Sequence, residues 1–240
     1  RFIAQRLSTS MGQQFIVENR PGAGGSIGTA AGVSAPPDGY TLTLIGASHT
    51  VYPSVYKIKF DPITDITAII QLAEGPYLVV VHPSVPAKSL QELIALAKTR
   101  PGKLNYATPG QGGNGHLATE RFAIMAQIKL NHIPYKGTSP ALTDTIAGQI
   151  DLYFSTTAAA LPYVRSGRLR ALAVTTPKRA AFVPDIPTVA ESGVPGYEAN
   201  NWYGLIGPKG LPSPIVARIN SEVTKVLELK ETSEQLQNDG

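Results

Sequence analysis

A run of glycines in the middle of the chain carries the clearest chemical signal. Residues 110–115, Gly-Gln-Gly-Gly-Asn-Gly, hold four glycines in six positions and follow a strand predicted over Leu104–Thr108. A helix is predicted to begin near His116, directly behind them. Glycine lets backbone N–H groups approach a ligand with no Cβ in the way, and a helix N-terminus adds about half a positive elementary charge. Together these features predict an anion-binding loop that needs no catalytic side chain.

The same glycines match the G-x-G-x-x-G pattern of dinucleotide-binding loops. That interpretation also requires an acidic residue about twenty positions further on. Residues 131–136, Asn-His-Ile-Pro-Tyr-Lys, contain no carboxylate. A P-loop would need lysine where His116 stands. A dinucleotide-binding enzyme that uses residues 110–115 therefore stays as an alternative only.

A second pattern, Gly24-Gly25-Ser26-Ile27-Gly28, matches the G-x-S-x-G nucleophile elbow of hydrolases. The elbow requires a strand that runs directly into the motif, whereas residues 20–23 separate it from the strand predicted over Phe15–Val17. The other interpretation is a turn whose glycines pack a helix N-terminus against a sheet. A serine hydrolase that uses Ser26 is the second alternative to a binding protein.

Other polar and aromatic residues lie where a ligand would be expected. Ser48, His49 and Thr50 follow the strand predicted over residues 40–45, and ligands of open α/β sheets bind beyond the carboxyl ends of strands. Further candidates are the glycine-loop residues Gly112, Gly113, Asn114, Gly115 and His116, the hydroxyls of Ser155 and Thr156, and the aromatic pair Trp202 and Tyr203. His116 has no second ligand at helical spacing, so zinc is not expected there. We predict no metal and no cofactor.

The composition limits the class of protein. Of 240 residues, 42% are hydrophobic and 16% charged, which predicts a sizeable core rather than disorder. The chain has no cysteine, which excludes disulfides and cysteine nucleophiles. The net charge of +4 is spread thinly and predicts no nucleic-acid partner. No stretch approaches the roughly 18 apolar residues of a membrane span.

Strand and helix patterns alternate along the chain, which predicts an α/β fold with covered sheets. Separate apolar elements are expected over residues 66–74 and 77–82, and Ser89 with Glu92 predicts a capped helix. Residues 1–78 form one predicted α/β unit and residues 79–198 a second. Residues 199–240 are expected to return to the first. A cleft between two such units is a preferred ligand site.

Several motifs, in one order along nearly the whole chain, resemble the Bug family of extracytoplasmic solute receptors. The glycine loop ending in His116-Leu117-Ala118 is one of them. The others lie at residues 18–25 (ENRPGAGG), 37–42 (PDGYTL), 134–137 (PYKG), 140–144 (PALTD), 167–175 (GRLRALAVT), 187–191 (PTVAE) and 193–197 (GVPGY). These proteins are the periplasmic receptors of tripartite tricarboxylate transporters, often described as TctC-like.

The resemblance implies a two-lobe Venus-flytrap fold of the type II-like periplasmic binding proteins, with three-layer α/β/α lobes. It implies a monomeric, non-enzymatic receptor that closes on a small mono- or dicarboxylate. The ligand is expected to be held largely by backbone amides and bridging waters, which are nearly as favourable as direct hydrogen bonds. The implied partners are the membrane components of the transporter, and the implied location is the periplasm.

The chain departs from the family pattern in two ways. The family's first carboxylate-binding loop and its last strand and helix are not found in these residues, and residues 1–7 do not resemble a signal peptide. We therefore expect a chain that lacks both ends of lobe 1. Many relatives carry Asp or Asn after the strand at residues 152–154, where this chain has Ser155-Thr156-Thr157. An amino-acid ligand is accordingly not expected.

Overall fold

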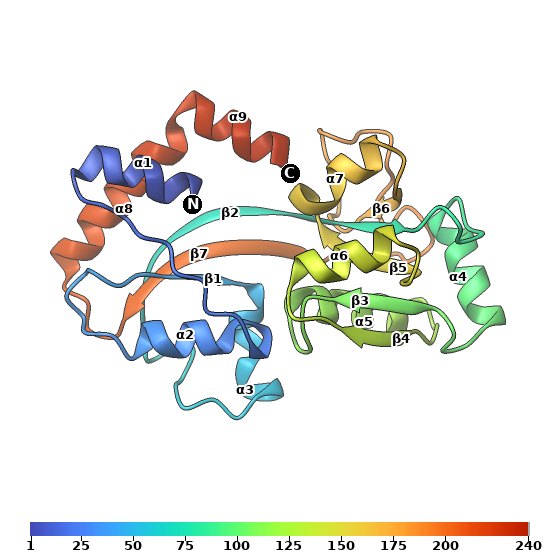
Figure 1. The fold of residues 1–240 in the computed structure, drawn as a ribbon, viewed down its shortest axis with the longest axis horizontal. Coiled ribbons are helices and arrows are strands. Elements are labelled where there is room, and N and C mark those ends of the chain that lie inside the picture. Colours follow the sequence, from blue (N-terminus) through green and yellow to red (C-terminus); the bar gives the residue numbers. More distant parts are fainter. Residues whose placement is uncertain (240) are drawn as a thin grey trace. The chain divides into compact units, whose positions relative to one another are not determined.

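The computed structural model describes residues 1–239 and the side chains of residues 1–236. The chain divides into two compact units. The first unit comprises Arg1–Ala73 and Trp202–Gln237, and the main part of the second is Glu74–Asn201. Two strands, β2 (Ile66–Val81) and β7 (Asn200–Pro208), carry the chain from one unit into the other (Figure 1).

The first unit is built on a small antiparallel sheet. Strand β1 (Thr43–Gly46) pairs with β7, and β7 lies beside β2. The long helix α8 (Ser213–Glu228) packs on α1 (Phe2–Met11). Ile219, Val223 and Val226 share one face of α8 and are buried with Leu7, as their helical spacing predicts. The remaining elements are the 3-10 turns Ala23–Gly25 and Ala47–Val51 and the helices α2 (Ser26–Val33), α3 (Tyr52–Val55) and α9 (Lys230–Asp239).

The second unit contains a five-strand arrangement in the order β6-β2-β5-β3-β4. Strands β5 and β6 are antiparallel to β2, whereas β3 is parallel to both β4 and β5. The strands are β3 (Asn105–Thr108), β4 (Asn131–Pro134), β5 (Leu152–Thr156) and β6 (Arg170–Val174), and the helices are α4 (Leu90–Thr99), α5 (Asn114–Met125), α6 (Thr138–Ile146) and α7 (Thr157–Arg165). Because β3, β4 and β5 are parallel, their carboxyl ends share one edge of the sheet.

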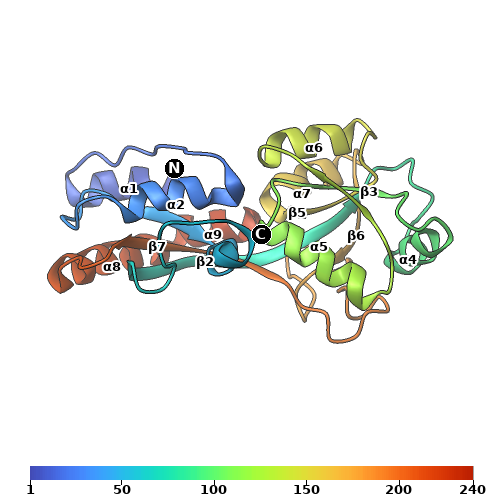
Figure 2. The same cartoon turned by 90° about the horizontal axis from the view of Figure 1, so that it is seen from below.

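Helices cover both faces of this sheet (Figure 2). Side chains alternate along a strand, so Val79 and Val81 of β2 face the core formed with α4 and α5. Leu78 and Val80 face the opposite core, formed with α6 and α7. All four valine and leucine side chains are fully buried. The almost wholly apolar run in β2 follows from this three-layer arrangement, since both of its faces need apolar residues.

The predicted cap of α4 is confirmed. The Ser89 hydroxyl oxygen accepts a hydrogen bond from the backbone N–H of Glu92 at 3.2 Å, and the Glu92 carboxylate accepts one from the N–H of Lys88. This reciprocal pair satisfies N–H groups that have no partner within the helix.

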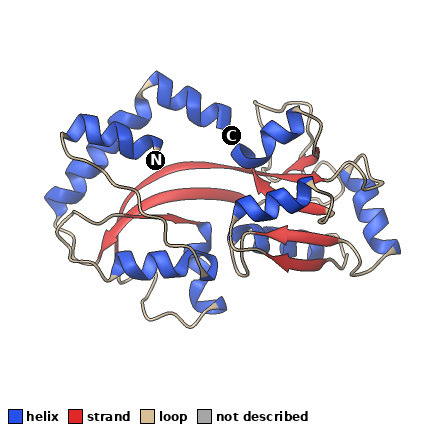
Figure 3. Cartoon of the chain, in the orientation of Figure 1, coloured by secondary structure: helices blue, strands red, loops and turns tan. Residues whose placement is uncertain are grey.

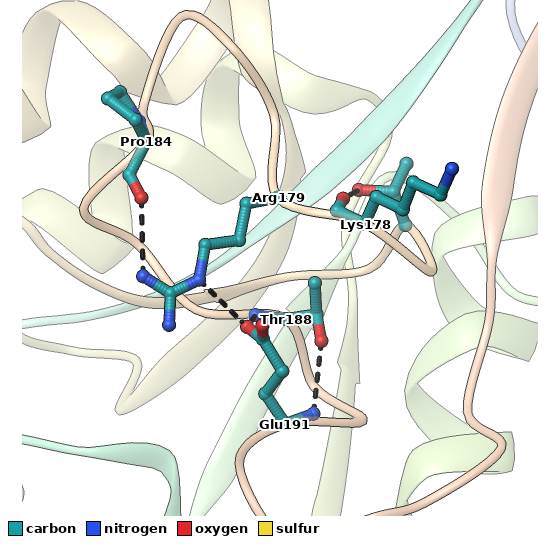
Figure 4. A network of polar contacts seen from close by, with 6 residues as sticks. Lys178, Arg179, Pro184, Thr188 and Glu191 are labelled. Atoms are coloured by element: carbon teal, nitrogen blue, oxygen red, sulfur yellow. Dashed lines mark hydrogen bonds and ion pairs between the residues drawn. The ribbon is translucent and has the colours of Figure 1, made fainter.

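A similar hydrogen-bond pair organises the irregular segment after β6 (Figure 4). The Thr188 hydroxyl accepts from the N–H of Glu191 at 3.0 Å, while the Glu191 carboxylate accepts from the N–H of Thr188 at 2.8 Å. Arg179 donates to the same carboxylate at 2.9 Å and to the carbonyl of Pro184 at 3.3 Å. These bonds hold the pKa of Glu191 below its ordinary value. These hydrogen bonds order a Pro-rich segment that contains no helix or long strand.

Two sequence predictions of secondary structure are wrong. Residues 15–17 form no strand but an irregular segment between α1 and α2 (Figure 3), where the Ile16 side chain is 82% exposed. The predicted break at Gly75-Pro76 does not occur, and β2 continues through it. Within the described residues, no helix is both long and apolar enough to cross a membrane.

Candidate functional site

The glycine loop joins the end of β3 to the start of α5, as the sequence predicts. Gly112 has φ +68°, a left-handed conformation that favours glycine. Gly113 is the N-cap of α5 with φ −70° and ψ 162°, an extended conformation open to any residue. The helix begins at Asn114, two residues earlier than predicted.

Two N–H groups of the loop are engaged within the loop itself. Gly112 donates to Nδ1 of His116 at 3.1 Å, and Gly113 donates to the carbonyl of Gly110 at 3.3 Å. The same carbonyl accepts from the hydroxyl of Thr108 at 3.2 Å. The loop is therefore closed on itself by hydrogen bonds and presents its remaining donors at the start of α5.

Those donors are the N–H groups of Asn114, Gly115 and His116. As the first three residues of α5, they have no acceptor inside the helix. Gly115 is buried, and a Cβ there would lie 3.4 Å from the carbonyl oxygen of Phe154. The helix start therefore packs directly on β5. The side-chain amide of Asn114, through Nδ2, donates a hydrogen bond to the Tyr77 hydroxyl at 3.0 Å, which ties the start of α5 to β2.

Ser155 and Thr156 lie at the end of β5, and the parallel pairing of β5 with β3 places them at the sheet edge that carries the glycine loop. Helix α7 begins at once, with Thr156 as its N-cap. Ser155 is fully buried and donates to the carbonyl of Thr156 at 3.2 Å, so its hydroxyl is turned inward. The Thr157 hydroxyl donates to the carbonyl of Pro76 at 3.1 Å.

A third helix begins at the same edge, and it is not among the site candidates predicted from the sequence. Strand β4 is parallel to β3, and α6 starts at Thr138 after Gly137, whose φ is +126°. The N–H of Gly137 donates to the carbonyl of Pro109 at 2.9 Å, which ties this turn to the glycine loop. The signal in the sequence was Gly137 directly before a Thr-Ser-Pro helix start. The N-termini of α5, α6 and α7 thus add their partial positive charges at one sheet edge.

The polar cluster after β1 belongs to the first unit. Ser48 donates to the carbonyl of Gly24 at 3.5 Å, and Thr50 donates to the carbonyl of Ala47 at 3.0 Å. The His49 side chain is only 3% exposed. Its Nε2 lies 2.7 Å from the carbonyl oxygen of Pro62, and its ring stacks on Phe60. The His49 imidazole therefore packs in the interior and does not line a surface.

Trp202 and Tyr203 are neighbours on β7 in the first unit, so their side chains leave opposite faces of the strand. Tyr203 pairs with Gly46, the last residue of β1. A Cβ at Gly204 would lie 3.3 Å from the carbonyl oxygen of Ile70 and 3.5 Å from the Trp202 ring, so the indole packs beside this glycine. Among the residues that the structure describes, no three His, Asp or Glu side chains are grouped as a metal ion would require.

Comparison with known proteins places these features in a family. The model of the tripartite tricarboxylate transporter family receptor matches residues 1–240. The chain is 36% identical over 237 residues to protein BugT of Bordetella pertussis, a match that covers 96% of this chain and 72% of BugT. The chain therefore belongs to the tripartite tricarboxylate transporter receptor family.

Solved structures agree with the family. A Rhodopseudomonas palustris protein with adipate superposes with a TM-score of 0.96 and 38% identity, over 100% of this chain and 81% of that one. MatC from the same organism, with bound malate, gives a TM-score of 0.94 and 30% identity, over 100% and 82%. The chain accordingly has the two-lobe α/β fold of periplasmic binding proteins.

Members of this receptor family are solute-binding proteins rather than enzymes, and no match supports either enzymatic alternative. The geometry of Ser26 agrees with this. Ser26 is buried at the first position of α2, after a 3-10 turn rather than at the end of a strand. A nucleophile elbow needs the reverse, an exposed hydroxyl on a strand-to-helix turn.

Proposed function

We propose that this receptor binds a small mono- or dicarboxylate at the N-terminus of α5. The observation that supports the proposal is the set of N–H groups of Asn114, Gly115 and His116, which the glycine loop leaves without an acceptor in the helix. A carboxylate oxygen accepts such donors, and the partial charges of three helix starts favour an anion there. None of the residues proposed to hold the ligand is Arg or Lys, so backbone dipoles supply the positive potential.

The other residues of the proposed site contact the ligand or hold the loops and turns around it. Thr156 offers its hydroxyl at the α7 start, and Ser155 holds that turn from behind. In the first lobe, Ser48 and Thr50 contact the ligand directly or through water, and His49 positions their turn. Trp202 and Tyr203 shape the ligand space, and Gly112 and Gly113 set the loop.

We further propose that residues 1–78 with 199–240 and residues 79–198 act as the two lobes that close on the ligand. The receptor would then be a periplasmic monomer that delivers its ligand to the membrane components of a tripartite transporter. This proposal is supported by the family match over residues 1–240. The relatives solved with adipate and malate make these two acids the first to test.

Titration of the protein with adipate, malate and their diamides tests the ligand class. A bound acid at one hundred times its Kd should raise the unfolding free energy by about 2.7 kcal/mol, which for this chain length raises Tm by roughly 5–10 °C. The diamides should give no rise, because they lack the negative charge. Aspartate should also be inert, since residues 155–157 offer no carboxylate to an ammonium group. Equal binding of an acid and its diamide would contradict the proposal.

Two substitutions at Gly113 separate binding from folding. A side chain at the N-cap lies over the N–H groups of the second and third helical residues. The methyl groups of Gly113→Val would cover those donors. Valine adopts a φ of −70° without strain, and the added Cβ would lie 3.3 Å from the Gly110 carbonyl oxygen, so that carbonyl must shift slightly. Gly113→Ser would place its hydroxyl oxygen on the same donors and should keep or raise Tm. Both variants should lose affinity, so a Gly113→Ser variant that binds like wild type would remove the α5 start from the site.

A further inference from the structure

Three rings are stacked beside the glycine loop. The centroids of His116 and His132 lie 4.1 Å apart with planes at 19°, and those of His132 and Tyr106 lie 4.9 Å apart at 20°. His116 belongs to α5, His132 to β4 and Tyr106 to β3. The sequence places the two histidines sixteen positions apart and gives no sign of their contact.

Hydrogen bonds fix the protonation state of the His116 ring. Its Nδ1 accepts the N–H of Gly112 at 3.1 Å, so this nitrogen carries a lone pair and no proton. The single N–H of the ring is then on Nε2. The bond exists only with the neutral form of this imidazole, because a proton on Nδ1 would face the N–H of Gly112.

His132 reaches the loop through Thr108. The Thr108 hydroxyl oxygen lies 3.2 Å from the carbonyl oxygen of Gly110 and 2.6 Å from Nε2 of His132, so one hydroxyl bridges the ring and the loop. The two imidazoles thus contact the glycine loop at two points. His116 binds Gly112, and His132 reaches Gly110 through the Thr108 hydroxyl.

The charged and titratable groups around the pair act in opposite directions. Glu120, on α5, favours protonation of both rings, and its carboxylate also accepts a hydrogen bond from the Tyr106 hydroxyl. Burial disfavours protonation of both. It keeps the pKa of His116 below its ordinary value and, with the charge of His116, lowers the pKa of His132 to about 4. Both rings are therefore neutral at neutral pH.

We infer that His116, backed by His132, is a positioning residue that holds the glycine loop in its ligand-binding form only while its imidazole is neutral. Protonation of Nδ1 turns an acceptor into a donor, breaks the bond to Gly112 and releases the loop that sets the start of α5. The receptor then loses affinity for its ligand on acidification. The statement about the loop stands on the geometry alone, whereas the loss of affinity rests on the proposed function.

The loop can be tested without any ligand. In the 15N-labelled full chain, the His116 ring should show an unprotonated Nδ1 and a protonated Nε2 at neutral pH. The amide resonance of Gly112 should titrate with the same midpoint as that ring. In His116→Asn, where Oδ1 replaces Nδ1 as a non-titrating acceptor, the Gly112 amide should stay constant. A Gly112 amide that does not follow the His116 ring in wild type would overturn the inference.

The predicted loss of ligand affinity on acidification is tested by measuring the affinity for adipate and malate from about pH 7.5 to about pH 5. Loss of one such hydrogen bond should lower the affinity of wild type about tenfold more than that of His116→Asn. Protonation of the acid itself affects both proteins equally and cancels in the ratio. His82→Asn is the matched control, since His82 follows the far end of β2 and contacts Ser84. It should keep the wild-type profile.

The possible outcomes separate the two proposals. Parallel pH profiles for wild type and His116→Asn would overturn the inference while leaving the carboxylate site intact. A wild-type protein that binds neither acid at pH near 7.5 would instead contradict the proposed ligands. In that case the Gly112 titration still decides whether His116 holds the loop.

Discussion

Replacement of Gly112 by alanine should reduce ligand affinity, whereas the same change at Gly102 should not. Both glycines are in the left-handed region, with φ +68° at Gly112 and +70° at Gly102. Both belong to the second unit, and a Cβ at Gly102 meets no atom within 4 Å. The two variants therefore carry the same kind of backbone strain, but only Gly112 is in the loop that sets the start of α5.

The magnitude follows from that strain. Placing an L-residue in the left-handed conformation lowers the free energy of unfolding by about 1–2 kcal/mol. Alanine restores about 0.4–1 kcal/mol of it, because it reduces the conformational entropy of the unfolded chain relative to glycine. A net loss near 1 kcal/mol should lower Tm by about 2–4 °C for a chain of this length. If the free Gly112→Ala protein relieves the strain by moving the loop, the ligand must restore the conformation. That cost of about 1–2 kcal/mol raises Kd about five- to thirtyfold.

Thermal unfolding and calorimetric titration with the acid of highest affinity would measure both quantities on the same preparations. The expected result is a rise of Kd in Gly112→Ala alone, with a loss of Tm in that variant no larger than in Gly102→Ala, because strain that the free loop relieves does not lower Tm. A Gly112→Ala protein that binds as tightly as Gly102→Ala would refute the reasoning, because it would show that the loop conformation does not control the site.

Other substitutions should change stability in defined ways. A Cβ at Gly32 would lie 1.7 Å from the Thr43 hydroxyl oxygen, so Gly32→Ala should lower the free energy of unfolding by at least about 1–3 kcal/mol. Adding Thr43→Ala should restore part of that free energy, as measured by urea titration. Equal stability of the single variant Gly32→Ala and the double variant would contradict the contact. Tyr106→Phe removes the hydroxyl that donates to the Glu120 carboxylate. In the same assay it should lower the free energy of unfolding by about 1.5 kcal/mol, the low end for a hydrogen bond to a charged group, because the carboxylate keeps some contact with solvent. The pKa of His132 in the folded protein is about 4, below its ordinary value of 6.5, so its contribution to stability is complete above about pH 6.5 and is lost as the pH falls toward about 4. His132→Gln should flatten that part of the pH profile of Tm, and an unchanged slope would show that another group titrates there.

The sequence by itself determined the features that depend on neighbours along the chain. The glycine loop before a helix, the capped helix that begins after Ser89 and the apolar run at residues 77–81 each follow from residue type and spacing. Their physical causes are local, namely backbone freedom at glycine, N–H groups without acceptors and the period of a strand. The order of several motifs was enough to indicate the family, which the family match over residues 1–240 confirmed.

Only the tertiary structure decided what each of these elements touches. Residues 15–17 look like a strand but have no strand beside them in the described part of the chain, and a strand needs a partner for its N–H and C=O groups. Strand β2 passes through Gly75-Pro76, where the Pro76 carbonyl accepts a hydrogen bond from the hydroxyl of Thr157, about eighty residues later, and β5 pairs with β2 from Tyr77 onward. His49 looked like a ligand-lining residue, but Phe60 and Pro62 enclose it.

The clearest case is His116. Its position one residue after the glycines suggested a ligand contact, but its ring turns back to hold Gly112 and stacks on His132 of another strand. No pattern in one sequence shows that contact, because the parallel pairing of β3 with β4 brings His132 to the loop. The sequence thus predicted a glycine loop at the start of a helix, and the packing of the second unit determines which of its N–H groups are bonded within the protein and which side chains hold it in place.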